Sequence, residues 1–354
     1  MRQAVFPFTA IVGQERMKRA LVLNAVNPSI GGVLIRGERG TAKSTAARAL
    51  AALLPDIEVV ADCRFGCDPI QPEHFCDECR ERAARGEELP VKRRRTRLID
   101  LPISATEDRV VGTLDLEQAI QKGERHFDPG VLAAANRGIL YVDEVNLLDD
   151  DIVNAILDAA AQGSYTVRRG PLTNTYRARF TLIGSMNPEE GALRPQIMDR
   201  FGLRVIVSGL GTNEERREVT HRVQAFQDNR YEFVARLAEA TEQVANEINL
   251  ARARLTHVTV APAAERLALE LVSHLRIHSS RAEIVTLQAA RARAAADERE
   301  TADVADVAAV APMALRLRYS SFIAEYIEAR RQEDTAIQET LESLLVTDGP
   351  EGKR

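Results

Sequence analysis

The residues best suited to chemistry fall in two short segments, and the first is a glycine-rich turn after an apolar run. It reads Gly37-Glu38-Arg39-Gly40-Thr41-Ala42-Lys43-Ser44. Backbone N–H groups in such a turn, with a helix N-terminus behind them, favour phosphate. Lys43 would reach the β- and γ-phosphates, and the Ser44 hydroxyl would ligate Mg²⁺. The residues predicted to surround the nucleotide are Gly37, Gly40, Thr41, Ala42, Lys43, Ser44 and Thr45.

The second segment is an apolar run that ends in two carboxylates, Ile139-Leu140-Tyr141-Val142-Asp143-Glu144. Asp143 would join the shell of the metal ion, and Glu144 would orient and polarise a water molecule. Together the two segments predict a site that binds MgATP and hydrolyses it.

Ala42 departs from the usual phosphate-loop pattern G-x-x-x-x-G-K-[ST], because it stands where the second glycine belongs. The alternative is a glycine-rich turn that caps an ordinary helix. The acidic strand favours the ATP site. Ala42 remains compatible with such a loop if its φ is negative, since only a positive φ demands glycine.

Composition is that of a globular protein, with 354 residues, of which 45% are hydrophobic and 5% aromatic. The formal net charge of −5 provides no general attraction to nucleic acid or anionic membranes. The first residues, 1–7, lack the apolar core of a signal peptide, and no apolar stretch is long enough to span a bilayer. We expect a soluble cytoplasmic protein without a membrane partner.

Residues 1–210 alternate β-rich runs with helical patterns, which predicts a doubly wound α/β domain with ligands at the carboxyl ends of parallel strands. A helix is predicted over Ser44–Leu54, ending before Pro55. The predicted strands are Gly32–Ile35, Ile57–Ala61, Ile139–Val142, Phe180–Ser185 and Arg204–Val207.

The second half is predicted to be helical. Residues 211–255 form a linker, in which dense charge over 213–250 indicates one or two long helices. Residues 256–346 form a helical bundle with breaks near Ser279-Ser280 and at Pro312, and 347–354 form a frayed tail.

Five longer stretches together resemble one family, the AAA+ ATPase (I-type) subunit of magnesium chelatase, from Phe6 to about Leu317. The stretches are Ala105–Asp115 (ATEDRVVGTLD), Phe127–Gly130 (FDPG), Asn136–Leu148, Gly184–Gln196 with its Asn-Pro-Glu-Glu-Gly, and Asp199-Arg200-Phe201-Gly202. The resemblance implies an AAA+ fold followed by an α-helical bundle. It also implies a motor that drives insertion of Mg²⁺ into protoporphyrin IX.

Matching positions imply further roles. Asn187 would be the sensor of the attacking water, with a strand-end cap before an Asn-Pro turn as the alternative. Arg200 would be the arginine finger that reaches the neighbouring subunit's γ-phosphate. Arg194 is its rival, or binds phosphate at the same interface, and either arginine could instead form an interface ion pair.

Arg281 matches the family's second sensor arginine, and its alternative is a solvated arginine at a helix start. The segment Phe8–Gln14 resembles the one that packs beside adenine, although its side chains would equally serve as core. A finger acting in trans requires a homo-oligomer, for which the family implies a hexameric ring.

The resemblance also implies separate partners. The chain lacks the D-x-S-x-S signature of an adhesion domain, so a VWA-type adhesion-domain subunit and a large porphyrin-binding catalytic subunit must be other chains. The alternatives keep the motor: a cobalt chelatase, another remodelling complex with an adhesion-domain partner, or a nucleic-acid motor.

All four cysteines lie in an insert at about 62–96, as Cys63-x3-Cys67 and Cys76-x2-Cys79. Two close pairs can present four thiolates to a structural Zn²⁺. The alternatives are free or redox-active thiols, or another metal.

Two basic runs suggest the hypothesis that the chain binds nucleic acid. Lys92–Arg95 follows the cysteines, and Arg168-Arg169 could lie on a pore hairpin. Net charge and the lack of interleaved aromatics favour a solvated loop or an acidic neighbour instead. Asp149–Asp151 is predicted to be a helix start rather than a metal site.

Overall fold

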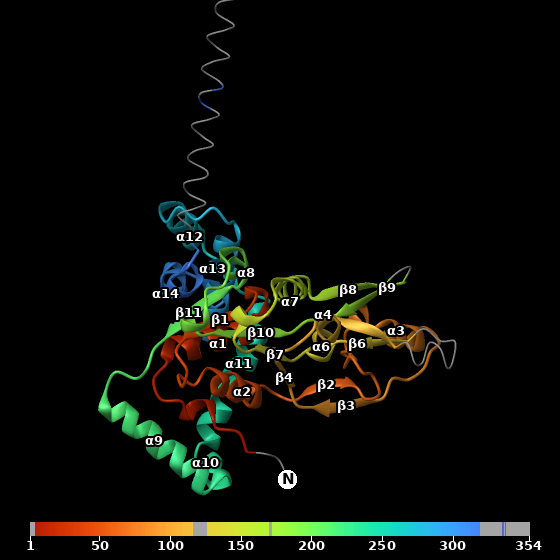
Figure 1. Cartoon of the computed structure of the whole chain (residues 1–354), viewed down its shortest axis with the longest axis horizontal. Helices are drawn as coiled ribbons and strands as arrows, with labels where there is room; N and C mark the ends of the chain where they lie inside the picture. The colour runs from red at the N-terminus through yellow and green to blue at the C-terminus, as the bar shows by residue number, and fades with distance from the viewer. Residues whose placement is uncertain (1–3, 116–125, 170–171, 319–334, 336, 338–354) are drawn as a thin grey trace, which may run out of the picture.

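The computed structural model describes residues 4–115, 126–169, 172–318, 335 and 337. Its centre is a parallel sheet of five strands in the order β11-β1-β10-β7-β4 (Figure 1). The strands are β1 (Val33–Gly37), β4 (Leu98–Leu101), β7 (Ile139–Val142), β10 (Thr181–Met186) and β11 (Leu203–Val207). Four of these confirm the predicted strands to within about one or two residues at each end.

Side chains of the sheet alternate between two cores, one on each face. In β1, Val33 and Ile35 join one core and Leu34 joins the other, and in β7, Ile139 and Leu140 divide in the same way. Because both faces of the parallel strands are covered, these strands read as continuous apolar runs. The predicted doubly wound α/β fold is confirmed.

Helices supply the two outer layers. Helices α1 and α2 cover one face together with C-terminal helices, and α4, α6, α7 and α8 cover the other. These elements are α1 (Glu15–Val26), α2 (Lys43–Leu53), α4 (Glu107–Val111), α6 (Val131–Ala134), α7 (Asp150–Gln162), α8 (Pro195–Arg200), and the 3₁₀ turns η1 (Phe8–Ala10), η2 (Pro28–Ile30), η4 (Val145–Leu147) and η5 (Pro188–Glu190). The helix after the phosphate loop and the helix start after Asp149 are confirmed.

One predicted strand is wrong in its place. Ile57–Ala61 does not join the parallel sheet, because β2 (Ile57–Val60) pairs antiparallel with β3 (Val91–Arg94) in a separate ribbon. Only Val59 and Val60 of β2 are buried. The sheet edge is taken by β4, which follows a basic run. The segment Lys92–Arg95, predicted as a solvated loop, lies mostly in strand β3, which contains Lys92, Arg93 and Arg94.

Three insertions extend from one side of the sheet, at the right of Figure 1. Two are the antiparallel pairs β5 (Gly112–Asp115) with β6 (His126–Pro129) and β8 (Ser164–Arg169) with β9 (Leu172–Arg177). The third contains η3 (Pro72–His74), α3 (Asp77–Ala84) and the β2–β3 ribbon. The predicted hairpin around Arg168 is confirmed as a hairpin, and its tip lies outside the described residues.

The chain after β11 is helical, as predicted, but it is divided differently. The linker holds three helices rather than one or two, and Pro312 lies inside α14 instead of ending a helix. A capping box at Asp303 and burial of Val310 and Met313 hold α14 against that proline's poor helix propensity. The elements are α9 (Asn213–Asp228), α10 (Arg230–Arg236), α11 (Ala238–Leu255), β12 (Thr259–Val260), α12 (Pro262–His274), α13 (Arg281–Ala296), β13 (Thr301–Ala302) and α14 (Val304–Ala314).

The predicted break near Ser279-Ser280 is confirmed between α12 and α13. The rest of the predicted bundle after Arg318, apart from residues 335 and 337, and the predicted tail 347–354 lie outside the described residues. No helix in the described part of the chain is long and apolar enough to cross a bilayer.

Candidate nucleotide-binding site

A cleft of about 580 Å³ opens where β1, β7 and β10 end. Its phosphate end is lined by the predicted residues Gly40, Thr41, Ala42, Lys43, Ser44, Thr45, Asp143, Glu144 and Asn187. The carboxyl ends of parallel strands meet at one edge of a sheet, so residues far apart in the sequence come together there. Gly37 does not line the cleft: it packs against β11, where an added Cβ would lie 2.3 Å from the Val207 carbonyl oxygen.

Ala42 has φ +63° and ψ 22°, so the condition of a negative φ, under which alanine would fit without strain, is not met. This is the left-handed conformation that glycine adopts freely, and it costs an L-residue roughly 1–2 kcal/mol. The loop keeps the backbone shape of a glycine position although the residue is alanine. Gln14 and Glu144, which also line the cleft, have positive φ as well.

Replacing Ala42 with glycine is expected to raise the free energy of unfolding by about 0.5–1 kcal/mol, because relief of the strain exceeds glycine's added chain entropy. Denaturant unfolding of the nucleotide-free protein measures this change. Ala46→Gly, inside α2, is the matched control and should lose stability. An Ala42→Gly protein no more stable than the parent would contradict the assigned strain.

Lys43 is folded back onto its own loop. Its ammonium donates hydrogen bonds to the carbonyl oxygens of Gly37 (2.5 Å) and Glu38 (2.7 Å). Burial lowers the pKa of Lys43, against the opposing effect of Asp143 and Glu144. Phosphate oxygens would be stronger acceptors than these carbonyls.

Asp143 is oriented by two hydroxyl groups. Tyr141 donates to Oδ1 at 2.9 Å, and the Ser185 hydroxyl donates to the same oxygen. Burial raises the pKa of Tyr141, which keeps its phenol protonated as a donor. The carboxylate thus has a fixed orientation in the cleft that Ser44 also lines, as a metal ligand requires.

Glu144 lies next to two charged residues that the sequence analysis missed. Its carboxylate is 3.6 Å from the Arg39 guanidinium, which also pairs with Glu190. Burial, and then the charge of Glu190, raises the pKa of Glu144, a direction that suits a general base. Both missed residues lie inside motifs already quoted, the glycine-rich turn and Asn-Pro-Glu-Glu-Gly.

Asn187 combines both of its predicted interpretations. It follows β10 and lines the cleft, and its side-chain oxygen accepts a hydrogen bond from the Glu189 N–H at 3.3 Å. It is therefore a turn cap whose position also suits a sensor of the nucleotide.

The far end of the cleft is apolar and would suit a base. Ala10, Ile11, Val12 and Gln14 of the segment Phe8–Gln14 line it, whereas Phe8 belongs to the core, so both interpretations of the segment hold in part. Helix α9 adds Val219, Arg222 and Val223, which no motif had indicated.

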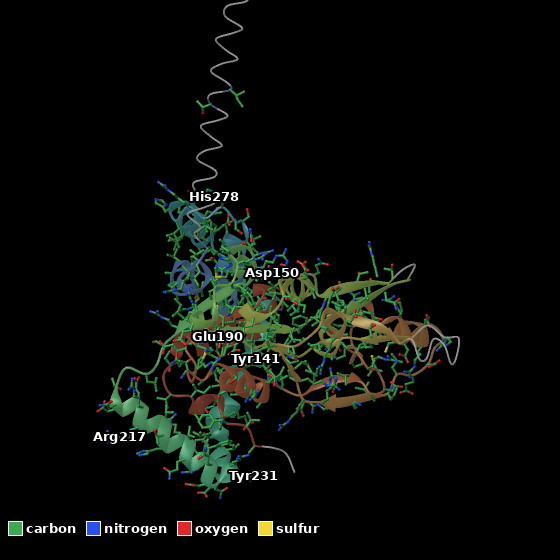
Figure 2. All side chains as sticks on the ribbon, in the orientation of Figure 1. Tyr141, Asp150, Glu190, Arg217, Tyr231 and His278 are labelled. Atoms are coloured by element: carbon green, nitrogen blue, oxygen red, sulfur yellow. The ribbon has the colours of Figure 1, made fainter. Side chains whose placement is uncertain are left out.

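The three predicted arginines lie outside this cleft. Arg200 pairs with Asp158 at 2.8 Å, and Arg194 pairs with Asp150 at 2.5 Å. Arg200 and Arg281 line a second, larger cavity of about 1670 Å³. In Figure 2, Tyr141 and Glu190 lie together near the centre, whereas His278 of the second cavity lies apart from them.

The C-terminal helices contact the segment that carries Arg200. Ser279 donates to the Asp199 carboxylate at 2.7 Å, and Arg318 donates to it at 2.5 Å. These two bonds lower the pKa of Asp199, although burial alone would raise it.

The four cysteines form one cluster. Their sulfur atoms all lie within 4.8 Å of one another, and those of Cys63 and Cys76 are 3.8 Å apart. Tetrahedral bonds of about 2.3 Å to Zn²⁺ require sulfur atoms about 3.8 Å apart, so the cluster fits the ion. All four are free thiols, and hydrogen bonds from Cys67 and Cys76 lower the pKa of Cys63.

A phosphate loop after β1, with Asp143-Glu144 after β7 in the same cleft, defines an ATPase of the AAA+ class. Residues 115–208 match the family described as "Magnesium chelatase, subunit ChlI", and residues 266–340 match the AAA lid domain.

Relatives extend this match over most of the chain. The magnesium-chelatase subunit ChlI homolog of Methanocaldococcus jannaschii is 48% identical over 90% of this chain and 87% of its own. The magnesium-chelatase 38 kDa subunit of Acidiphilium rubrum is 48% identical over 89% and 91%. The chain belongs to the family of magnesium-chelatase ChlI subunits.

Solved structures agree with this assignment. A chain from the complex between subunits BchI and BchD of magnesium chelatase is 43% identical, with a TM-score of 0.54 over 92% of this chain and 99% of that one. A crystal structure from Cytophaga hutchinsonii, 20% identical with a TM-score of 0.57, supports the fold alone.

Proposed function

We propose that this chain is the ATP-hydrolysing motor subunit of a magnesium chelatase, which drives insertion of Mg²⁺ into protoporphyrin IX. The observation that carries the proposal is the cleft that gathers Lys43, Asp143, Glu144 and Asn187 in a chain 48% identical to a magnesium-chelatase subunit.

In this proposal the glycine-rich turn binds the phosphates of MgATP. Lys43 neutralises the β- and γ-phosphates, and Ser44 and Asp143 hold Mg²⁺. Glu144 polarises the attacking water, and Asn187 helps to hold it. The chemistry is phosphoryl transfer to water, for which positioning and charge are the main requirements.

Arg200 and Arg281 act on the nucleotide of a neighbouring copy. The support is their position: in the described part of the chain they line the second cavity and not the cleft. Arg200 is the finger, Arg281 the second sensor, and Arg194 a phosphate contact at the same interface. A head-to-tail interface closes into a ring, and the family resemblance favours a hexamer.

For the motor we propose the domain bounds that the sequence predicts, an ATPase domain over 1–210, a linker over 211–255 and a helical bundle over 256–346. Its partners are a VWA-type adhesion-domain subunit, like the BchD named in the related complex, and a large porphyrin-binding chain. Neither a membrane nor nucleic acid is a partner.

Zn²⁺ is a second, structural cofactor, held by Cys63, Cys67, Cys76 and Cys79. The support is the fit of the sulfur spacing to a tetrahedral ion. The ion would fix the fold of the insert and supply no chemistry to hydrolysis. We propose the cytoplasm as the location, since its reducing conditions keep thiols available for metal.

The test is partner capture with a Glu144→Gln chain, tagged in its native host and purified with MgATP. Recovery of an adhesion-domain subunit and a very large tetrapyrrole-binding chain, identified by mass, is the expected result. The matched control adds Lys43→Ala, which should abolish nucleotide-dependent capture. Recovery of the adhesion-domain protein alone, or of DNA, would keep the motor and reject the porphyrin. If the complex forms, coupled turnover with Mg²⁺ or Co²⁺ decides the metal.

A further inference from the structure

The four-cysteine module, defined as residues 57–94, touches the start of the acidic strand rather than the cleft. Asn136, just before β7, is 5% exposed. Its side-chain nitrogen donates to the Phe65 carbonyl at 3.1 Å, between Cys63 and Cys67. Its side-chain oxygen accepts from the Arg179 N–H at 3.1 Å, just before β10. One amide therefore ties the cysteine loop to the two strands that lead to Glu144 and Asn187.

Arg137 makes a second tie from the adjacent position. Its guanidinium pairs with Asp68 at 2.8 Å and donates to the Glu58 carbonyl at 2.6 Å. Its own N–H donates to the Arg179 carbonyl at 2.6 Å. Arg137 has φ +58°, a left-handed conformation that persists in a non-glycine residue only where its surroundings enforce it.

The module also supports the base of the β8–β9 hairpin. The ring of Phe65 stacks on Tyr176 of β9 with centroids 5.5 Å apart, and Tyr176 contacts Tyr165 of β8. Arg177 donates to the Glu73 carbonyl at 3.1 Å. The hairpin, the start of β7 and the start of β10 thus all rest on one cysteine-bearing loop.

Charge around this loop matches a metal-thiolate centre. Four thiolates around Zn²⁺ carry a net negative charge, which neighbouring cations would compensate. The Arg94 guanidinium lies over Gly66, where an added Cβ would be 2.4 Å from its Nη2, and it donates to the Asn136 carbonyl at 3.4 Å. Gly66 also has φ +62°, so glycine is required there twice over.

We propose that the zinc module is a positioning device for hydrolysis. Metal binding fixes the Phe65–Asp68 loop, and Asn136 and Arg137 pass that order to the β8–β9 hairpin and to the strands leading to Glu144 and Asn187. The inference rests on the zinc site of the proposed function. Asn136 and Arg137 are positioning residues, because they act through the strands and touch no nucleotide.

The test uses two variants of the full chain. One removes the metal ligands, and the other removes the hydrogen bond from Asn136 to the cysteine loop. Cys76→Ser with Cys79→Ser removes the metal. Asn136→Asp keeps the acceptor for the Arg179 N–H but loses the donor to Phe65. Arg85→Ala is the control, because this exposed arginine of the module pairs within it, with Glu87. The readouts are zinc per chain, amide hydrogen exchange, and kcat and KM for MgATP.

The parent is expected to hold about one zinc per chain. The cysteine variant should lose it, exchange faster in β8, β9 and 136–142, and lose about tenfold or more in kcat. Asn136→Asp should keep the zinc yet show the same faster exchange and lower kcat, with KM nearly unchanged. Arg85→Ala should match the parent in every readout.

Outcomes separate this inference from the motor itself. A parent that hydrolyses MgATP without zinc overturns the metal and leaves the motor standing. An Asn136→Asp protein with parental exchange and turnover overturns the tie, even if the cysteine variant fails to fold. A zinc-loaded parent without ATPase activity rejects the motor, and hydrogen exchange still decides the tie.

Discussion

Replacing Arg200 with alanine is expected to lower kcat for ATP hydrolysis by about 10³–10⁵-fold while nucleotide binding stays intact. In the single chain, Arg200 pairs with Asp158 and is absent from the cleft, so its proposed action needs a second copy. Turnover and binding of a fluorescent ATP analogue, measured on the same preparation, separate the two effects.

Mixing provides a sharper form of this experiment. An Arg200→Ala chain has an intact cleft, and a Lys43→Ala chain has an intact finger. In a mixed assembly, some interfaces place the intact cleft of an Arg200→Ala chain against the intact Arg200 of a Lys43→Ala chain. These interfaces should hydrolyse ATP, although neither variant does so alone. Arg194→Ala tests the rival finger, because it removes an exposed arginine that is also paired with an aspartate. Near-normal turnover of Arg200→Ala would remove it from the finger role, and a large loss in Arg194→Ala would transfer the role.

Glu144→Gln is expected to lower kcat by about 10²–10⁴-fold and to leave MgATP binding near the parental level. The change keeps the size of the side chain and removes the carboxylate that we propose as the base. Single-turnover hydrolysis measures the loss. Parental turnover in Glu144→Gln would show that another group activates the water.

The pH dependence adds a second check on Glu144. A base works when deprotonated, so turnover should fall as the pH drops through its pKa, which burial and Glu190 hold above the usual value. Glu190→Gln removes the repulsive charge and should move this acid limb to lower pH, with a smaller loss of kcat than Glu144→Gln. An acid limb unmoved by Glu190→Gln would exclude this coupling.

Much of the phosphate end could be predicted from sequence, because its chemistry lies in contiguous motifs. Lys43, Ser44 and Asp143 each follow or end a buried strand, and such strands are recognisable as apolar runs. The base end was only half predicted. Helix α9 contributes Val219 and Val223 to the cleft, but its sequence has no motif that predicts this position.

The errors have a common cause in long-range pairing. Ile57–Val60 forms a strand, as its residues indicate. Its partner is β3 of the cysteine insert, and nothing in the sequence of Ile57–Val60 indicates that pairing. The true edge strand, Leu98–Leu101, is short and contains Asp100, so its signal is weak. The φ of Ala42 is fixed by the need to turn from β1 into α2, which sequence periodicity does not report.

The positive φ angles of Gln14, Ala42 and Glu144 set which substitutions an evolving chain can accept around the nucleotide. Glycine at positions 14 and 42 would relax the backbone without removing a catalytic group. Glycine at position 144 would also relax the backbone, but it would remove the carboxylate that we propose as the base. β-Branched residues, which adopt left-handed backbone least readily, are closed to all three positions. Among related sequences, we therefore expect glycine to replace the residues at positions 14 and 42, and we expect Glu144 to be kept.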